Sequence, residues 1–203
     1  MKLYTIHTPS HKPLYDNFLK SLPTEFEHIN KEIPQECETG DYYEKGWDIT
    51  CYRKVEFFYE KCKENQGEYI VFSDVDIQFF TEKLEETLLK EIGDYDIACQ
   101  DDCGIYCSGF FIVNCNEATL QLFKTMKEKY VKEDQTSLNA HIGLVKAKFL
   151  SRKFFTVGHI IRRQWVGQDF SIPYEILIHH SNWTIGIDNK MKLMEVVKNK
   201  LNK

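Results

Sequence analysis

Two aspartates separated by one residue, Asp74 and Asp76, are the side chains of this 203-residue chain best placed for chemistry. They follow the apolar run Tyr-Ile-Val-Phe at 69–72, which is typical of a strand buried on both faces. In extended backbone, residues two apart point to the same side, so the two carboxylates converge while Val75 faces the core. Neighbouring carboxylates repel unless a proton or cation lies between them. Such oxygen ligands suit Mg²⁺ or Mn²⁺.

A solvated turn after a strand is the alternative interpretation, since an Asp-x-Asp pair alone is common. The sequence Ile-Gln-Phe-Phe at 77–80 places apolar residues on the far side of the pair as well. A plain surface turn needs no apolar sequence on both sides, so this placement favours the metal site. Ligands also gather at the carboxyl ends of strands in α/β sheets, where this pair is expected.

The elements that must position the pair alternate between strands and helices from the first residue. This pattern predicts an α/β fold with a mostly parallel central sheet flanked by helices. Strands are expected at 2–6, 26–33, 69–72, 95–99 and 109–113, and helices at 10–22 (capped by Ser10), 45–64, 82–92, 116–130 (capped by Asn116), 134–144 (capped by Asp134) and 191–201.

Four segments in order along the chain resemble the motifs of GT-A nucleotide-diphospho-sugar transferases. They are EYIVFSDVDIQFF at 68–80, SGFFIVN at 108–114, DQTSLN at 134–139 and HHSNWTIG at 179–186 followed by Lys190. Small viral enzymes of this fold are similar in length and in these motifs. The resemblance implies a single GT-A-like (Rossmann-like) domain over 1–203, with a nucleotide-binding half at about 1–110. The acceptor half and the C-terminal metal and diphosphate segment would occupy about 111–203.

The resemblance also implies a metal site and a donor site. Asp74 would contact the metal and the ribose, and Asp76 would bind the metal. His180, which aligns better than His179, would complete the protein's ligands to Mn²⁺ or Mg²⁺. The residues expected to bind the donor are His7, Thr8, Lys54, Asp74, Val75, Asn182, Gly186 and Lys190.

Catalysis by such an enzyme needs a carboxylate or amide near the anomeric carbon. Asp134 and Gln135 are the first choice, because the resembling retaining enzymes place such a pair beside the donor sugar. Asp102, with its neighbour Asp101, is the second choice. A helix N-cap, worth about 1 kcal/mol, is the alternative role for Asp134, and both roles stay open.

Composition and charge limit the kinds of partner and the cellular compartment that we expect. The net charge of −5, with lysines interleaved among acids, argues against nucleic acid as a partner. No apolar run is long enough for a signal peptide or a membrane span, and seven cysteines are an odd number. We therefore expect a cytoplasmic protein without a transmembrane anchor, in the host cytoplasm if the chain is viral.

The sequence thus predicts a metal-dependent glycosyltransferase that takes a nucleotide-sugar, by analogy a UDP-sugar, to a glycan or glycoprotein acceptor. One rival is an Asp-dependent phosphotransferase with Asp74 as its nucleophile, which needs a free aspartate and a phosphate-binding Lys and Ser/Thr. The other rival is a non-catalytic carbohydrate-binding module that uses Trp47, Trp165 and Trp183. The second rival leaves the carboxylate pair unexplained.

Overall fold

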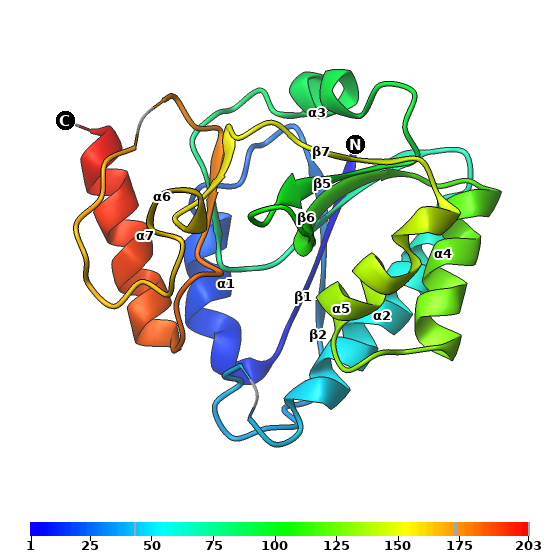
Figure 1. Cartoon of the computed structure of the whole chain (residues 1–203), viewed down its shortest axis with the longest axis horizontal. Helices are drawn as coiled ribbons and strands as arrows, with labels where there is room; N and C mark the ends of the chain where they lie inside the picture. Colours follow the sequence, from blue (N-terminus) through cyan, green and yellow to red (C-terminus); the bar gives the residue numbers. More distant parts are fainter. Residues whose placement is uncertain (43, 173, 203) are drawn as a thin grey trace.

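The central element of the fold is a six-stranded sheet, seen in the computed structural model of Figure 1. The structure describes residues 1–42, 44–172 and 174–202. In the order β2-β1-β3-β6-β5-β7, only β6 runs against its neighbours, so the prediction of a mostly parallel α/β sheet is confirmed. The strands are β1 (Lys2–His7), β2 (Glu27–Glu32), β3 (Tyr69–Ser73), β5 (Ile97–Asp101), β6 (Tyr106–Asn114) and β7 (Ala147–Phe149).

Helices cover both faces of this sheet because the buried strands are apolar on both sides. From β3, Ile70 and Phe72 join a core cluster with α2, α4 and α5, whereas Val71 joins the cluster under α1 and α3. Figure 1 shows α2, α4 and α5 gathered on one side and α1 with α7 on the other. The helices are α1 (Lys12–Leu19), α2 (Trp47–Glu64), α3 (Glu85–Ile92), α4 (Glu117–Glu128), α5 (Asp134–His141), α6 (Gly158–Ile161) and α7 (Ile187–Leu201).

A second, three-stranded sheet carries the segment after the aspartate pair. Its order is β4-β9-β8, formed by Ile77–Phe79, Ile178–His180 and Phe154–Thr156. The antiparallel pairing of β4 with β9 places Ile77 opposite His180. This pairing brings the C-terminal histidine motif back to the aspartate pair across about half of the chain.

Several predicted helix ends differ from the structure. Ser10 caps no helix, because residues 9–11 form a 3-10 turn and α1 runs only from Lys12 to Leu19. The last helix begins at Ile187 and not at 191, which brings Lys190 into its first turn. The Asn116 cap is confirmed as a capping box with Thr119. Among the described residues, no helix combines the length and apolar character that crossing a membrane requires.

His179 is fully buried, and neither of its ring nitrogens has a hydrogen-bond partner among the described residues. Burial lowers its pKa from 6.5 to about 3. Below pH 6.5 the His179 imidazole therefore binds a proton in the unfolded chain but not in the folded chain, and stability falls as the pH drops. The loss is about 1.4 kcal/mol per pH unit, or about 2 kcal/mol at pH 5.

We expect His179→Leu to remove this part of the acid sensitivity. The free energy of unfolding is measured in urea at pH 7.5 and at pH 5.0, without metal. Its drop between the two pH values should be smaller in the variant than in the parent. His141→Leu, at a half-buried surface position, is the control. If the free energy of unfolding drops as much in the His179 variant as in the parent, the acid sensitivity does not come from His179.

Candidate functional site

A cavity of about 410 Å³ opens where the carboxyl ends of β1, β3 and β5 meet the amino ends of α5 and α7. All the residues that the sequence nominates for catalysis, donor binding or metal binding, except Asp101, line this cavity. They are His7, Thr8, Lys54, Asp74, Val75, Asp76, Asp102, Asp134, Gln135, His180, Asn182, Gly186 and Lys190. The topology thus brings together residues from the first strand to the last helix.

Asp74, Asp76 and His180 form a cluster that could hold a metal ion. Their ligand atoms all lie within 4.8 Å of one another, and His180 Nε2 is 3.2 Å from Asp76 Oδ1 and 4.0 Å from Asp74 Oδ2. The expectation that the pair sits in extended backbone is wrong, because residues 75 and 76 form a bend. The bend turns both carboxylates toward His180 and buries Val75. Two carboxylates and an imidazole nitrogen fit Mn²⁺ or Mg²⁺.

The space beside this cluster explains why residue 109 of β6 is a glycine. A Cβ at this position would lie 2.4 Å from His180 Cε1 and 2.6 Å from Asp74 Oδ2. The carbonyl oxygen of Gly109 also accepts a hydrogen bond from the backbone amide of Asp74, with an N···O distance of 2.7 Å. The close approach of β6 to the cluster therefore requires a residue without a side chain.

Gln100, which the sequence analysis did not nominate, fixes the orientation of His180. Its side-chain nitrogen donates to the carbonyls of Phe154 (3.2 Å) and Phe155 (3.1 Å), so its oxygen faces His180 Nδ1 at 2.8 Å. That oxygen accepts a hydrogen bond from Nδ1–H, which leaves the Nε2 lone pair directed at the aspartates. A buried amide in this position selects the tautomer that can bind a metal.

We expect Gln100→Leu to weaken metal binding about 10–100-fold, because His180 loses the partner that sets its tautomer. Calorimetric titration with Mn²⁺ in the presence of a nucleoside diphosphate measures the change. Gln78→Leu is a matched control, since Gln78 is similarly buried but does not line the cavity. Equal affinities in the two variants would refute a positioning role for Gln100.

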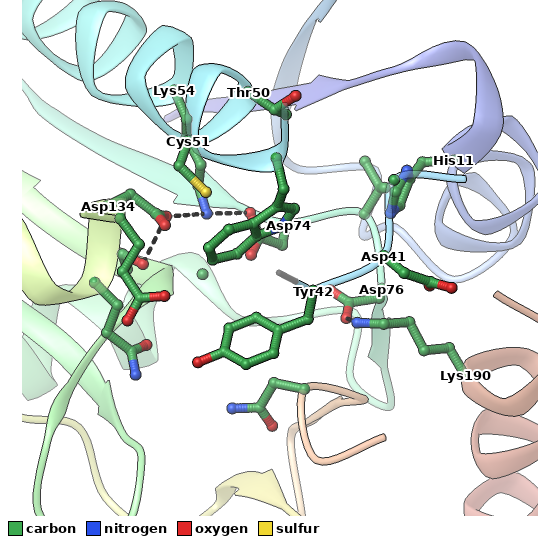
Figure 2. A pocket seen from close by; sticks show the side chains of 18 of the residues that line it. His11, Asp41, Tyr42, Thr50, Cys51, Lys54, Asp74, Asp76, Asp134 and Lys190 are labelled. Atoms are coloured by element: carbon green, nitrogen blue, oxygen red, sulfur yellow. Dashed lines mark hydrogen bonds and ion pairs between the residues drawn. The ribbon is translucent and has the colours of Figure 1, made fainter. Parts of the chain in front are cut away.

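Lys54 connects the metal cluster to α5. Its ammonium lies 2.6 Å from Asp74 Oδ1 and 2.8 Å from Asp134 Oδ2, and Ser108 Oγ donates to Asp134 Oδ2 at 2.8 Å (Figure 2). Burial alone would lower the pKa of Lys54, but the two carboxylates raise it well above its usual range. Burial likewise opposes ionisation of Asp134, and Lys54 outweighs it and lowers the pKa. The charges of Lys54 and Asp134 are therefore kept inside the cavity.

The cap role proposed for Asp134 is wrong. Glu133 occupies the cap position, no side-chain cap bond is present there, and Asp134 is the first residue of α5. Its buried carboxylate is used by Lys54 and Ser108 instead. The residue thus belongs to the charge network of the cavity and not to the helix end.

Asp76 pairs with Lys190 from the first turn of α7. Gly186 precedes this helix with φ 87°, a conformation that favours glycine, and accepts a backbone bond from Lys190 at 2.9 Å. Burial would raise the pKa of Asp76, but Lys190 and His180 hold it well below its usual range. By contrast, burial raises the pKa of Asp74 despite Lys54, and the charge of Asp76 adds to that rise.

Asp102 faces the cavity with both oxygens held by donors. Trp183 Nε1 donates to Oδ1 at 2.6 Å, and Gln135 Nε2 donates to Oδ2 at 3.0 Å. The Trp183 indole packs on Gly158, where a Cβ would lie 2.3 Å from Nε1. Asp101 does not line the cavity, and its carboxylate accepts from the backbone of Gly104. Of the two neighbouring aspartates, the structure thus places only Asp102 against Gln135.

Further cavity residues escaped the sequence analysis. They include His11, Asp41, Tyr42, Thr50 and Cys51, which Figure 2 labels around the aspartates. Asp41 and Tyr42 lie in an irregular loop before α2, where no periodicity marks a residue as inward-facing. For Gln100, the available signal was a polar side chain directly after the apolar residues 97–99 of β5.

The fold and the Asp-Asp-His cluster together are those of GT-A glycosyltransferases, which are transferase enzymes. The chain belongs to the nucleotide-diphospho-sugar transferase family, whose model matches residues 64–194. A comparison with curated proteins found no match.

Solved structures share the fold at low sequence identity. A crystal structure of the galactosyltransferase LgtC with donor and acceptor sugar analogues has a TM-score of 0.60 and 12% identity, covering 95% of each chain. A glycosyltransferase involved in glycosylation of the major capsid of PBCV-1 has a TM-score of 0.56 and 11% identity, covering 96% of this chain and 98% of that one. The glycosyltransferase GlyE of Streptococcus pneumoniae TIGR4 has a TM-score of 0.60 and 14% identity, with 94% of this chain but 59% of its own covered.

Proposed function

We propose that the protein transfers a sugar from a UDP-sugar to a hydroxyl group of a glycan or glycoprotein, with Mn²⁺ (or Mg²⁺) as its cofactor. The observation that carries this proposal is the Asp74–Asp76–His180 cluster beside the amino end of α7. We place the reaction in the cytoplasm, that of the host if the source is a virus. We also treat 1–203 as one catalytic domain with the halves expected from the sequence.

The diphosphate of the donor fits between the metal cluster and α7. The unsatisfied amides at a helix start attract anions, and Gly186 allows a phosphate to approach the backbone closely. Lys190 supplies a point charge there, and its present partner is Asp76. The bound metal would act as a Lewis acid that neutralises the developing charge of the leaving group. Lys190 is then free to turn to the phosphates.

The nucleoside fits at the carboxyl end of β1, on the opposite side of Asp74 from the diphosphate. His7 and Thr8 line the cavity there, and His7 is oriented by Asn30 Oδ1 at 3.0 Å from Nδ1 and by stacking on Tyr15. Uracil is our choice of base by analogy with the resembling enzymes. Asp74, which faces both this region and the metal cluster, would contact the ribose.

The donor sugar fits beyond the diphosphate, against Asp102, Asp134 and Gln135. A carboxylate or amide at the anomeric carbon stabilises the oxocarbenium-like transition state. Gln135 offers such an amide and is held by Asp102, while Asp134 is held by Lys54 and Ser108. Groups fixed in this way need little reorganisation during reaction, which is the main electrostatic advantage of an enzyme site.

Thermal unfolding with nucleotides and metals tests the proposal. A ligand at 100 times its Kd stabilises by about 2.7 kcal/mol, which raises Tm by roughly 5–10 °C in a chain of this size. We expect this rise with UDP plus Mn²⁺, and little with either alone. A response to free sugar but not to UDP plus Mn²⁺ would instead support the carbohydrate-binding module. A screen of nucleotide-sugars for Mn²⁺-dependent hydrolysis then identifies the donor.

A further inference from the structure

The arginines of this chain are unevenly distributed. Of four, Arg53 lies on α2 and pairs with Glu36 at 2.7 Å, whereas Arg152, Arg162 and Arg163 fall within twelve residues of one another. These three side chains are exposed, and none has a carboxylate within ion-pair distance among the residues that the structure describes. In a chain of net charge −5 they concentrate positive charge in one short stretch of the sequence.

The segment that carries two of them is anchored beside the cavity at both ends. On one side, Gly158 packs on Trp183 and His159 Nε2 contacts the carbonyl of Asp101 at 2.7 Å. On the other side, Gln164 lines the cavity, and the next residue donates its backbone amide to the carbonyl of Trp183 at 2.7 Å. Arg162 and Arg163 lie between these anchors, at the rim next to the residues that hold Asp102.

Arg152 lies in the turn that precedes β8, and β8 leads directly into the segment that carries Arg162 and Arg163. Burial, with the charges of Asp102 and Asp101, raises the pKa of the Cys103 thiol, and the charges of Arg162 and Arg152 lower it. Cys103 follows Asp102 directly in the loop between β5 and β6. The charges of two arginines from separate segments thus act on this loop, which also carries Asp101 and Asp102.

The backbone at this rim is held in an uncommon conformation. Only three described residues other than glycine have positive φ, and two of them are Cys103 (φ 59°) and Arg162 (φ 53°). Such conformations cost free energy and are often imposed where a side chain must be aimed at a ligand. The lysines that line the cavity, Lys54 and Lys190, are already engaged by carboxylates.

We propose that the acceptor carries an anionic group, a carboxylate or a phosphate ester, which Arg152, Arg162 and Arg163 hold at this rim. The proposal rests on the function proposed above, since it assigns the donor to the metal side of Asp102 and the acceptor to the rim beyond it. Guanidinium forks bind carboxylate and phosphate oxygens in pairs. They also offset the repulsion that an anionic acceptor would meet from a protein of net negative charge.

Nitrogen-15 NMR of the four arginine Nε–H groups tests the proposal directly. The donor site is saturated with UDP and Mg²⁺, and inorganic phosphate, glucuronate and neutral glucose are then titrated separately. We expect saturable shifts of the Arg152, Arg162 and Arg163 signals with phosphate or glucuronate, none with glucose, and no shift of Arg53. The anion that shifts them distinguishes a phosphorylated from a carboxylated acceptor. Equal shifts of all four signals, or none, would overturn the proposal.

The double variant Arg162→Gln/Arg163→Gln supplies a second measurement. It is expected to lose at least tenfold in affinity for the anion, while UDP–Mg²⁺ binding and donor hydrolysis stay at parental values. Lys124→Gln/Lys129→Gln, at exposed positions in and directly after α4, makes the same charge change away from the cavity and should retain the anion site. Equal losses in both double variants would show a general charge effect and refute the site. Failure of the parent to bind UDP with metal would instead contradict the proposed donor function.

Discussion

The Asp76→Asn variant is expected to lose metal-dependent nucleotide binding while keeping its fold. Asp76 is the carboxylate that His180 approaches most closely, at 3.2 Å, and its pKa is held low so that it is ionised at neutral pH. Asparagine keeps the volume but removes the charge. The loss in Mn²⁺ affinity should exceed the roughly 10–100-fold expected when only a partner of a metal ligand is removed.

The fold should survive because the charge left behind is not trapped. Lys190, the ion-pair partner of Asp76, retains 20% side-chain exposure at the cavity mouth and can turn to water. Calorimetric titration with Mn²⁺ and UDP measures affinity, and thermal unfolding without metal checks the fold. Asp101→Asn makes the same change at an aspartate that does not line the cavity, and this variant should bind Mn²⁺ and UDP like the parent. Unchanged Mn²⁺-linked UDP affinity in Asp76→Asn would remove it from the metal site.

The residues that the sequence could nominate share a simple position in the fold. Asp74 follows an apolar strand, and Gln135 and Lys190 lie in the first turns of helices. Strand ends and helix starts at one edge of an α/β sheet converge whatever the details of packing. That is why a linear pattern of motifs could predict the sheet and thirteen of the residues that line one cavity.

Side-chain partners could not be predicted in the same way, because they depend on contacts between distant segments. Asp134 has the residue type and position of a cap, yet Lys54, eighty residues earlier, draws its carboxylate into the cavity. Gln100 gains its role only because β8 presents two carbonyls to its amide. Local sequence carries no information on such pairings, and loops without periodicity, such as the one with Tyr42, carry still less.

The Gln135→Ala variant is expected to lower kcat by about 100-fold or more with little change in donor affinity. If the amide acts near the anomeric carbon, its benefit appears mainly in the transition state, where positive charge builds on the sugar. Gln135 is a cleaner test than Asp134, because removing the buried Asp134 carboxylate leaves Lys54 with one partner fewer and costs stability. Gln121→Ala on the surface of α4 is the control. Near-parental turnover would exclude Gln135 from the mechanism.

Gln135 also donates to Asp102, so a slow variant could have lost either its own amide or the orientation of that carboxylate. A double-mutant cycle with Asp102→Asn separates the two, because independent contributions multiply and residues that act as a unit do not. If Gln135 acts directly on the sugar, the double variant should be slower than either single variant by nearly the product of their effects. If it only positions Asp102, the double variant should be no slower than Asp102→Asn. All variants must bind UDP and Mn²⁺ like the parent, which thermal unfolding with both ligands verifies.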